Sequence, residues 1–290
     1  MNLDELCSIV RQAGGKDRAM EYAEELLEKI NLLESGNTYE RLLTPFRSAK
    51  NEGDLRGRVL EINFANLFAE KGIALRCATK QGMSGDVDFC WDVKGHEVFI
   101  EMKLLGQDQE TRGTINQQLK DAGVSETMIS DDTRDVARIQ RDIFQKSSTT
   151  KFNPNPKESW INLVAVDVSE LQLGTIDVVD CLLAAGGNNL ASRHCDTACL
   201  RPQIVGVFED TTSSLRAEQA KWIEDFHVLP TDASHPREYL HGVLFLFRQP
   251  AERAALSYEL SSVTVWNPTI IDHQKTGAFS KLINSIFPLP

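Results

Sequence analysis

The strongest constraint on the fold comes from two short segments in which apolar and polar residues alternate strictly. Residues 86–93 read Asp-Val-Asp-Phe-Cys-Trp-Asp-Val, and residues 98–104 read Val-Phe-Ile-Glu-Met-Lys-Leu. Such alternation places successive side chains on opposite faces of an extended strand. Residues 94–96, Lys-Gly-His, lie between the segments and provide a turn. The pattern predicts an antiparallel hairpin with one apolar face and one face that carries acids and a lysine.

The register of this hairpin follows from its apolar rows. A loop of two residues, or of four residues in the same register, pairs Phe89 with Ile100 and places Asp88 directly across from Glu101. A slip of one residue would send the apolar side chains of one strand to the polar face. The sequence therefore predicts two carboxylates that face each other across neighbouring strands.

Two opposed carboxylates need a compensating charge. The Cβ atoms of directly opposed residues lie roughly 4.5–5.5 Å apart, and like charges at that distance destabilise the pair. A hard divalent cation with oxygen ligands would stabilise it. Lys103 lies two residues beyond Glu101 on the same face, across from Asp86, and adds a positive charge beside the acids.

A solvated hairpin face is the simpler interpretation of these charges, but two features favour a functional site. The second strand ends in Leu104-Leu105, apolar on both sides, which is typical of a central strand. Phe99 and Leu105 also flank Glu101 and Lys103 on the charged face. A carboxylate and an amine held among apolar neighbours on a central strand predict a site.

Helical and strand patterns along the chain predict an α/β order around the hairpin. We expect helices over 3–33, 38–49 and 55–70, strands over 73–79, 86–93 and 97–105, a polar loop over 106–131, a helix over 132–147 and a strand over 161–168. Farther on, we expect helices near 176–185, 213–226 and 278–286, a strand near 203–208, and strands near 240–248 and 258–266 that pair with each other.

The helix predicted over 55–70 carries apolar side chains on two opposite sides. Asp54 is its expected N-cap. One stripe contains Leu55, Val59 and Ile62, and the other contains Leu60, Phe64, Leu67 and Phe68. A helix that is apolar on two sides is packed between two layers. We expect the N-terminal helices on one side of it and the sheet on the other.

Composition excludes several classes of protein. The chain has 290 residues, 41% of them hydrophobic and 25% charged, which is ordinary for a globular protein and excludes fibrous and disordered chains. No apolar run is long enough to span a bilayer, and the N-terminus lacks the pattern of a signal peptide, so we expect a cytoplasmic protein with reduced cysteines. The net charge of −11 argues against a general polyanion binder, although acids clustered at a metal site remain compatible with a nuclease.

An acid on one strand, a turn, and Glu-x-Lys on the next strand resemble the PD-(D/E)xK nuclease superfamily, which has the restriction-endonuclease-like fold. The matching residues are 85–89, Gly-Asp-Val-Asp-Phe, and 100–103, Ile-Glu-Met-Lys. The helix before them and the helix and strand after them match the αβββαβ core of that family. The resemblance covers residues 55 to 168, and the proline of the motif is absent because Val87 precedes Asp88.

The resemblance implies roles for individual residues. Asp88 and Glu101 would bind one or two Mg²⁺ ions, with Mn²⁺ as a substitute and the Met102 carbonyl as a further ligand. Lys103 would orient or activate the attacking water. Asp86 remains a rival to Asp88 as the metal ligand.

Two further residues are candidates for the same site. Some branches of the family place a Glu on the first core helix, and Glu61 lies near the stripe that we expect to face the sheet; a boundary Glu on a long helix is the alternative. Gln140 falls within the apolar side of the helix over 132–147 and needs a hydrogen-bonding partner. The active site could supply that partner, as in some family branches, and a core Gln bonded to backbone is the alternative.

These observations predict a restriction-endonuclease-like α/β fold with a mixed central sheet. We expect an N-terminal helical segment (1–50), a nuclease core (51–168) and a C-terminal elaboration that continues the same domain (169–290). The expected function is Mg²⁺-dependent endonucleolytic hydrolysis of phosphodiester bonds, in DNA, with a role in restriction, repair or defence. The alternative is an inactive nucleic-acid-binding or protein-interaction module on the same fold. A homodimer or a partner protein could assist substrate loading, and no membrane association is expected.

Overall fold

The computed structural model describes residues 2–12, 19–35, 39–49, 52–106, 113, 117–118, 121, 132–169, 171, 176–195, 204–209, 235–248 and 258–290. The helices are α1 (Leu3–Gln12), α2 (Ala19–Ser35), α3 (Glu40–Arg47), α4 (Glu52–Glu70), α6 (Asp132–Lys146), α7 (Val178–His194) and α9 (His273–Ile286), with a 3-10 helix at Pro236–Glu238. The strands are β1 (Arg76–Thr79), β2 (Val87–Val93), β3 (His96–Leu104), β4 (Trp160–Asp167), β5 (Gly242–Arg248) and β6 (Leu260–Trp266).

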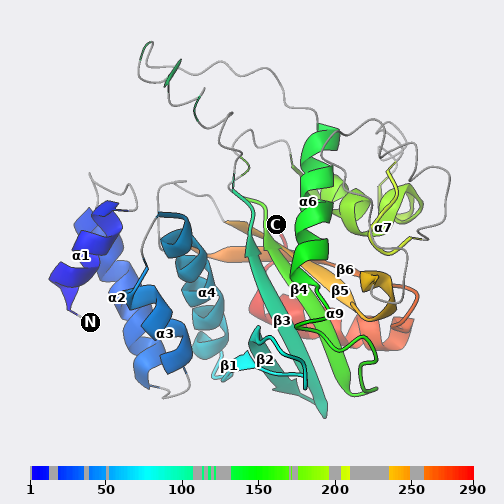
Figure 1. Ribbon diagram of the computed structural model, residues 1–290, viewed down its shortest axis with the longest axis horizontal. Coiled ribbons are helices and arrows are strands. Elements are labelled where there is room, and N and C mark those ends of the chain that lie inside the picture. The colour runs from blue at the N-terminus through cyan, green and yellow to red at the C-terminus, as the bar shows by residue number, and fades with distance from the viewer. Residues whose placement is uncertain are drawn as a thin grey trace.

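These strands form one mixed sheet of six in the order β1-β2-β3-β4-β5-β6 (Figure 1). The first three pair antiparallel, β3, β4 and β5 pair parallel, and β6 returns antiparallel to β5. Parallel neighbours need crossover connections, and α6 and α7 lie in the two crossovers. The predicted α/β architecture is confirmed, with its order of helix, three strands, helix and strand in α4, β1 to β3, α6 and β4. The predicted pairing of 240–248 with 258–266 is also confirmed, as β5 and β6.

The β2–β3 hairpin has the predicted register. Phe89 pairs with Ile100, and the pairing continues to the turn. Lys94 and Gly95 form the two-residue loop with φ values of 49° and 78°. Positive φ at both central positions suits the right-handed twist of the flanking strands, and glycine adopts it without a steric penalty. The short loop therefore holds the register that the apolar rows favour.

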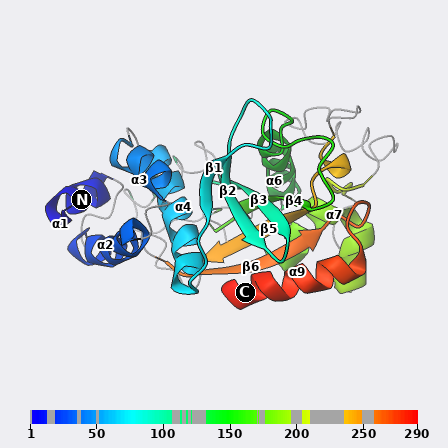
Figure 2. The ribbon, with the colours of Figure 1, turned by 90° about the horizontal axis from the view of Figure 1, so that it is seen from below.

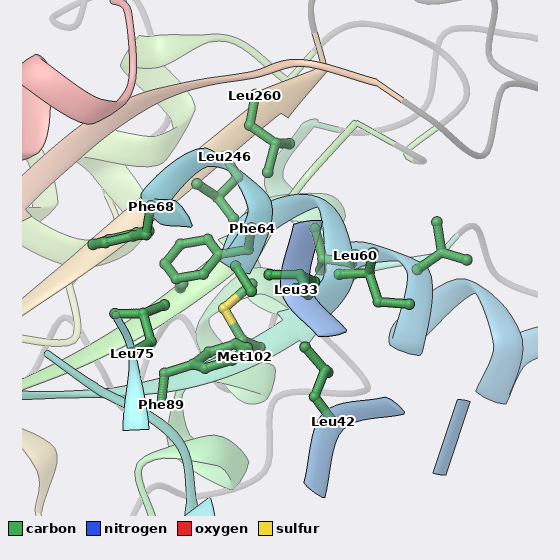
Figure 3. Packing of buried hydrophobic residues seen from close by; sticks show 14 of the residues in the cluster. Leu33, Leu42, Leu60, Phe64, Phe68, Leu75, Phe89, Met102, Leu246 and Leu260 are labelled. Atoms are coloured by element: carbon green, nitrogen blue, oxygen red, sulfur yellow. The ribbon is translucent and has the colours of Figure 1, made fainter. Parts of the chain in front are cut away.

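The predicted sandwich of α4 is confirmed. α2 and α3 pack on one side of α4, and β3 lies on the other. Figure 3 shows Phe64 and Phe68 of α4 among Phe89, Met102 and Leu246 of the sheet. Phe64 stacks on Phe89 with ring centroids 5.5 Å apart. Fully burying such a side chain contributes about 1.5–3 kcal/mol.

α6 and α7 cover the opposite face of the sheet. They form a second apolar cluster with the odd-numbered side of β3 and the even-numbered side of β4. α9 lies with α4 on the first face, so that α6 and α9 are on opposite sides of the sheet in Figure 2. The strands β3, β4 and β5 are therefore covered on both faces, as parallel strands require. None of the described helices is long and apolar enough to cross a bilayer.

Several sequence-based boundaries need correction. α4 begins at Glu52, so Asp54 lies inside the helix and is not its N-cap. The strand predicted over 203–208 is wrong, because the described part, 204–209, is irregular and turn structure. Its Val207 and Phe208 N–H groups donate to the carbonyls of Ala184 and Ala185, in the turn of α7 that precedes the kink at Gly187.

Other differences concern the lengths of helices. α7 and α9 are longer than predicted. α1 and α2 together account for the helical region predicted over 3–33, with 13–18 outside the described residues. The helix predicted over 213–226 and most of the loop over 106–131 also lie outside the described residues.

Candidate active site

Glu101 is a buried carboxylate at the centre of the sheet. It lies on β3, between β2 and β4, and is 0% exposed. Its Oε1 accepts a hydrogen bond from Lys146 Nζ at 2.8 Å and a second from Lys151 Nζ. Its Oε2 is buried and has no hydrogen-bond partner within the described part of the chain. Burial of a carboxylate costs free energy unless it is paired, and here the two ammonium groups provide the pairing on one oxygen only.

Asp88 lies opposite Glu101 in the continuation of the Phe89–Ile100 register. It is the second residue of β2, and its Oδ2 accepts a hydrogen bond from the Met102 N–H at 2.7 Å. The N–H and C=O of one strand residue point to the same neighbouring strand. The Met102 carbonyl therefore points toward β2, the strand that carries the Asp88 carboxylate. Its predicted role as a metal ligand requires this direction.

Glu61 joins these acids from the opposite layer. It lies on α4, its side chain is 14% exposed, and both its carboxylate oxygens accept hydrogen bonds from Arg58 at 2.9 Å. Burial and then the charge of Asp88 raise the pKa of Glu61 from 4.5 to about 7, against the opposing effects of Arg58 and Lys146. Glu61 on α4 is therefore close enough to Asp88 for the two carboxylates to repel each other.

Burial and the neighbouring charges also shift the pKa values of Glu101 and Lys146. Burial, followed by the charge of Asp88, raises the pKa of Glu101, and Lys146 and Lys151 oppose the shift. Burial alone would lower the pKa of Lys146, but the charge and hydrogen bond of Glu101 raise it overall. Lys146 therefore stays an ammonium ion at neutral pH. These couplings indicate one electrostatic unit made of three acids and their cations.

Lys103 occupies the predicted face of β3 but has a different partner. Its Nζ lies 3.3 Å from Oδ2 of Asp142 on α6, and its side chain is 27% exposed. Because Asp142 is itself nearly buried, this ion pair connects the end of β3 to α6. Lys103 lies two residues beyond Glu101 on β3, and its role beside the two hairpin acids stays a prediction.

Two residues singled out in the sequence are not brought to the carboxylates. Gln140 Nε2 donates to the carbonyl oxygens of Ala184 and Val205 at 3.0 and 2.7 Å, so its side chain joins α6 to α7 as a core amide. Asp86 is directed to Lys80, whose Nζ lies 3.6 Å from its Oδ1. Between the two hairpin acids considered as metal ligands, Asp88 is the one tied to Met102.

Sequence reasoning missed Lys146, Lys151 and Asp142. Asp142 and Lys146 stand four residues apart on the buried side of α6, and two charged residues there were the signal to look for. Lys151 lies in the turn after α6, in which no local pattern indicates its role. Only the tertiary structure carries it to Glu101, 50 residues earlier in the chain.

The turn that carries Lys151 is attached to the segment before β2. The Gly85 N–H donates to the Thr150 carbonyl at 2.7 Å, and the Asn153 N–H donates to Gln81 Oε1 at 2.8 Å. A Cβ at position 85 would lie 3.1 Å from both Thr150 O and Lys151 Cγ. Glycine therefore permits the close approach that places Lys151 near the start of β2.

A second group of possible metal ligands lies near the other end of the hairpin. Cys90, Asp92 and Glu97 place their ligand atoms within 4.8 Å of one another, and they are the only such group of three in the part of the chain that the structure describes. The Arg76 guanidinium contacts all three, at 3.0 Å from Cys90 Sγ and at 2.8 and 2.7 Å from Asp92 and Glu97. Because one cation already satisfies this group, we do not assign a metal to it.

The Glu61, Asp88 and Glu101 carboxylates are spaced more widely than this group, and their chemistry fits a hard divalent cation. Glu101 has a buried oxygen without a partner among the described residues, and Asp88 has one oxygen that the Met102 N–H leaves free. Together with the Met102 carbonyl they offer only oxygen ligands, which Mg²⁺ prefers.

Comparisons with known proteins give no family for this chain: no family model matches it, and neither a curated protein nor a solved structure is significantly similar.

Proposed function

We propose that this protein is a metal-dependent nuclease that hydrolyses phosphodiester bonds in DNA. The observation that carries the proposal is Glu101, fully buried in a central strand and opposite Asp88. One of its oxygens has no hydrogen-bond partner among the described residues, and lysines donate to the other. A structural role would not require a carboxylate there, because an apolar residue could fill the same position at lower cost. The order of α4, β1 to β3, α6 and β4 supports a restriction-endonuclease-like core of the PD-(D/E)xK type.

The local charge explains how an acidic protein could bind a phosphodiester. Four acids (Glu61, Asp88, Glu101 and Asp142) lie with five bases (Arg58, Lys103, Arg141, Lys146 and Lys151), so the cluster has one surplus positive charge when every group is ionised. A bound Mg²⁺ would add two further positive charges. The site would then attract a phosphate although the whole chain carries a net charge of −11.

Each residue has a task in this proposal. Asp88, Glu101 and the Met102 carbonyl would hold Mg²⁺, with Mn²⁺ as a substitute, and Glu61 would support them from α4. The metal supplies Lewis acidity toward a phosphoryl oxygen and toward bound water. Lys103 would orient the attacking water and balance charge on the phosphate. Hydrolysis adds water across one P–O bond, leaving a phosphate monoester and a free hydroxyl.

The charge of the whole chain bears on how DNA reaches the site. The chain carries a net charge of −11, which disfavours the approach of a polyanion. We therefore propose that a homodimer or a partner protein assists in binding DNA. Restriction, repair and defence against foreign DNA are all compatible roles.

The test is cleavage of supercoiled plasmid, single-stranded DNA and RNA in Mg²⁺, Mn²⁺ and EDTA. We expect metal-dependent cleavage of DNA that falls at least about 100-fold in Glu101→Gln and Lys103→Ala. Asp92→Asn, an exposed acid on the same hairpin, is the matched control and should keep its activity. Cleavage that survives Glu101→Gln would refute the site, and binding without cleavage would identify the inactive module instead.

A further inference from the structure

Two lysines converge on a single oxygen of Glu101 from different elements. Lys146 is the last residue of α6, and Lys151 lies in the turn that follows. Both ammonium groups contact Oε1, and neither has another partner among the described residues. Two ammonium groups therefore share one carboxylate oxygen, and neither has a hydrogen-bonded carboxylate of its own among the described residues.

Both ammonium groups keep unused hydrogen-bond donors. Each carries three N–H groups and spends one on Glu101. The Lys146 and Lys151 side chains are 31% and 28% exposed, so solvent or a ligand can reach them from outside. Lys103 differs because it pairs with another acid, Asp142, which Arg141 also contacts. An anion with several acceptor oxygens would satisfy the free donors of both lysines at once.

The positions of the two lysines are fixed by the surrounding structure. The turn that contains Lys151 is attached to the segment before β2 by the Gly85–Thr150 hydrogen bond of 2.7 Å. At the end of α6, the Ser147 carbonyl accepts a hydrogen bond from the buried Tyr239 hydroxyl. These contacts hold Lys146 and Lys151 beside the acids without help from a ligand, which is the arrangement expected of a preorganised site.

We infer that Lys146 and Lys151 form an anion site for the phosphate of the substrate, held in place by the contacts at the end of α6 and in the turn that follows. The inference rests on the proposed function for the identity of the ligand as a phosphodiester. It adds a binding role for two residues outside the Glu-x-Lys motif. The lysines bind phosphate oxygens directly, whereas Lys103 acts at the water.

The experiment distinguishes the effect of the lysines on anion binding from their effect on stability, which comes from neutralising the buried Glu101 carboxylate. The reference protein carries Glu101→Gln, because a neutral amide at position 101 lets the fold remain stable when both lysines are removed. It is compared with a triple variant that also carries Lys146→Gln and Lys151→Gln. The reference carrying Lys275→Gln and Lys281→Gln on α9 is the matched control, with the same change of charge on the opposite face. Circular dichroism and thermal melting verify that all three are folded.

The first probe is a fluorescent DNA oligonucleotide in EDTA, titrated at several salt concentrations. Removing the lysines should weaken binding at least about tenfold and lower the slope of log K against log salt by about two, one for each phosphate contact. The α9 control should keep the slope. An unchanged slope in the lysine variant, or an equal fall in the control, would overturn the inference.

The second probe is inorganic phosphate, followed by protein NMR, and it distinguishes the two proposals. Phosphate binding that depends on the lysines, in a wild-type protein that cuts no nucleic acid, would support the anion site and refute the nuclease. If the wild type cleaves DNA but binds both probes equally well without the lysines, the nuclease proposal is supported and the anion site is refuted. If neither probe binds through the lysines and no cleavage occurs, both proposals are wrong.

Discussion

The Asp88 carboxylate accepts a hydrogen bond from the backbone N–H of Met102 at 2.7 Å. This contact lies just beyond Phe89–Ile100, the last recorded backbone pair of the β2–β3 ladder. The Asp88 side chain thus continues the hydrogen bonding between β2 and β3 beyond the last backbone pair. It ties the strand that carries Asp88 to the strand that carries Glu101, and it leaves one Asp88 oxygen available.

Replacing Asp88 separates this structural contact from the charge. In Asp88→Asn the amide oxygen can still accept the Met102 N–H, so the free energy of unfolding should change by less than about 1 kcal/mol, while Asp88→Ala should lose about 1–2 kcal/mol. Both should lose DNA cleavage, because neither supplies a carboxylate. Urea denaturation and plasmid cleavage check the two effects, and an active Asp88→Asn would contradict the ligand role.

Removing both lysines from Glu101 should destabilise the fold strongly. Lys146→Met with Lys151→Met leaves a buried carboxylate without a partner, which costs about 3–5 kcal/mol. Adding Glu101→Gln should restore most of that loss, because the amide carries no charge. Denaturant midpoints of the double and triple variants measure the difference. Equal stability of the two would show that Glu101 does not depend on the lysines.

The raised pKa of Glu61 predicts how stability depends on pH. With a pKa of about 7 in the folded state against an ordinary 4.5, Glu61 keeps its proton in a window where the unfolded chain has lost it. The free energy of unfolding then falls as pH rises from 4.5 to 7 and stays lower above 7.

Glu61→Gln removes that titration and is therefore the test. The stability of the variant relative to wild type should increase between pH 5 and pH 8, in buffers free of divalent ions. Urea denaturation at both values gives the comparison. A difference between variant and wild type that does not change with pH would contradict the raised pKa.

Gly85→Ala tests the close approach of the Lys151 turn. The new Cβ would lie 3.1 Å from a backbone oxygen and from Lys151 Cγ, so the turn must shift. We expect a loss of about 1–3 kcal/mol, as for overpacking elsewhere, and weaker DNA binding. Gly57→Ala on α4, with nothing within 4 Å of its Cβ, is the control and should stabilise by about 0.5–1 kcal/mol. Similar effects of the two substitutions would argue against a specific contact.

Gln140→Ala distinguishes a core amide from a catalytic residue. The substitution removes the buried amide that donates to the Ala184 and Val205 carbonyls and leaves a cavity between α6 and α7, and we expect a loss of about 1–3 kcal/mol. DNA cleavage per folded molecule should remain close to wild type. Denaturation and cleavage on the same preparation check both parts. A loss of cleavage without a loss of stability would restore the catalytic interpretation.

The hairpin could be predicted from its residues because its determinants are local. Alternation set the faces of β2 and β3, and matching the apolar rows set the register that pairs Phe89 with Ile100. The two stripes of α4 likewise predicted a helix between two layers. The prediction of a strand over 203–208 was wrong because the determinants of that segment are not local. Its Val207 and Phe208 suit a strand, but their N–H groups donate to carbonyls in α7 just before the Gly187 kink, a partner that no local pattern reveals.

The sequence by itself determined which acids share a face of the hairpin, since a period of two and a short turn leave one register that buries the apolar side chains. Only the tertiary structure decided what surrounds those acids. Lys146 and Lys151 reach Glu101 across 45 and 50 residues, and Gln140 turns to α7 instead. A buried charge takes whichever partner the packing of distant elements brings near, and that choice depends on how the layers pack, which strand periodicity does not specify.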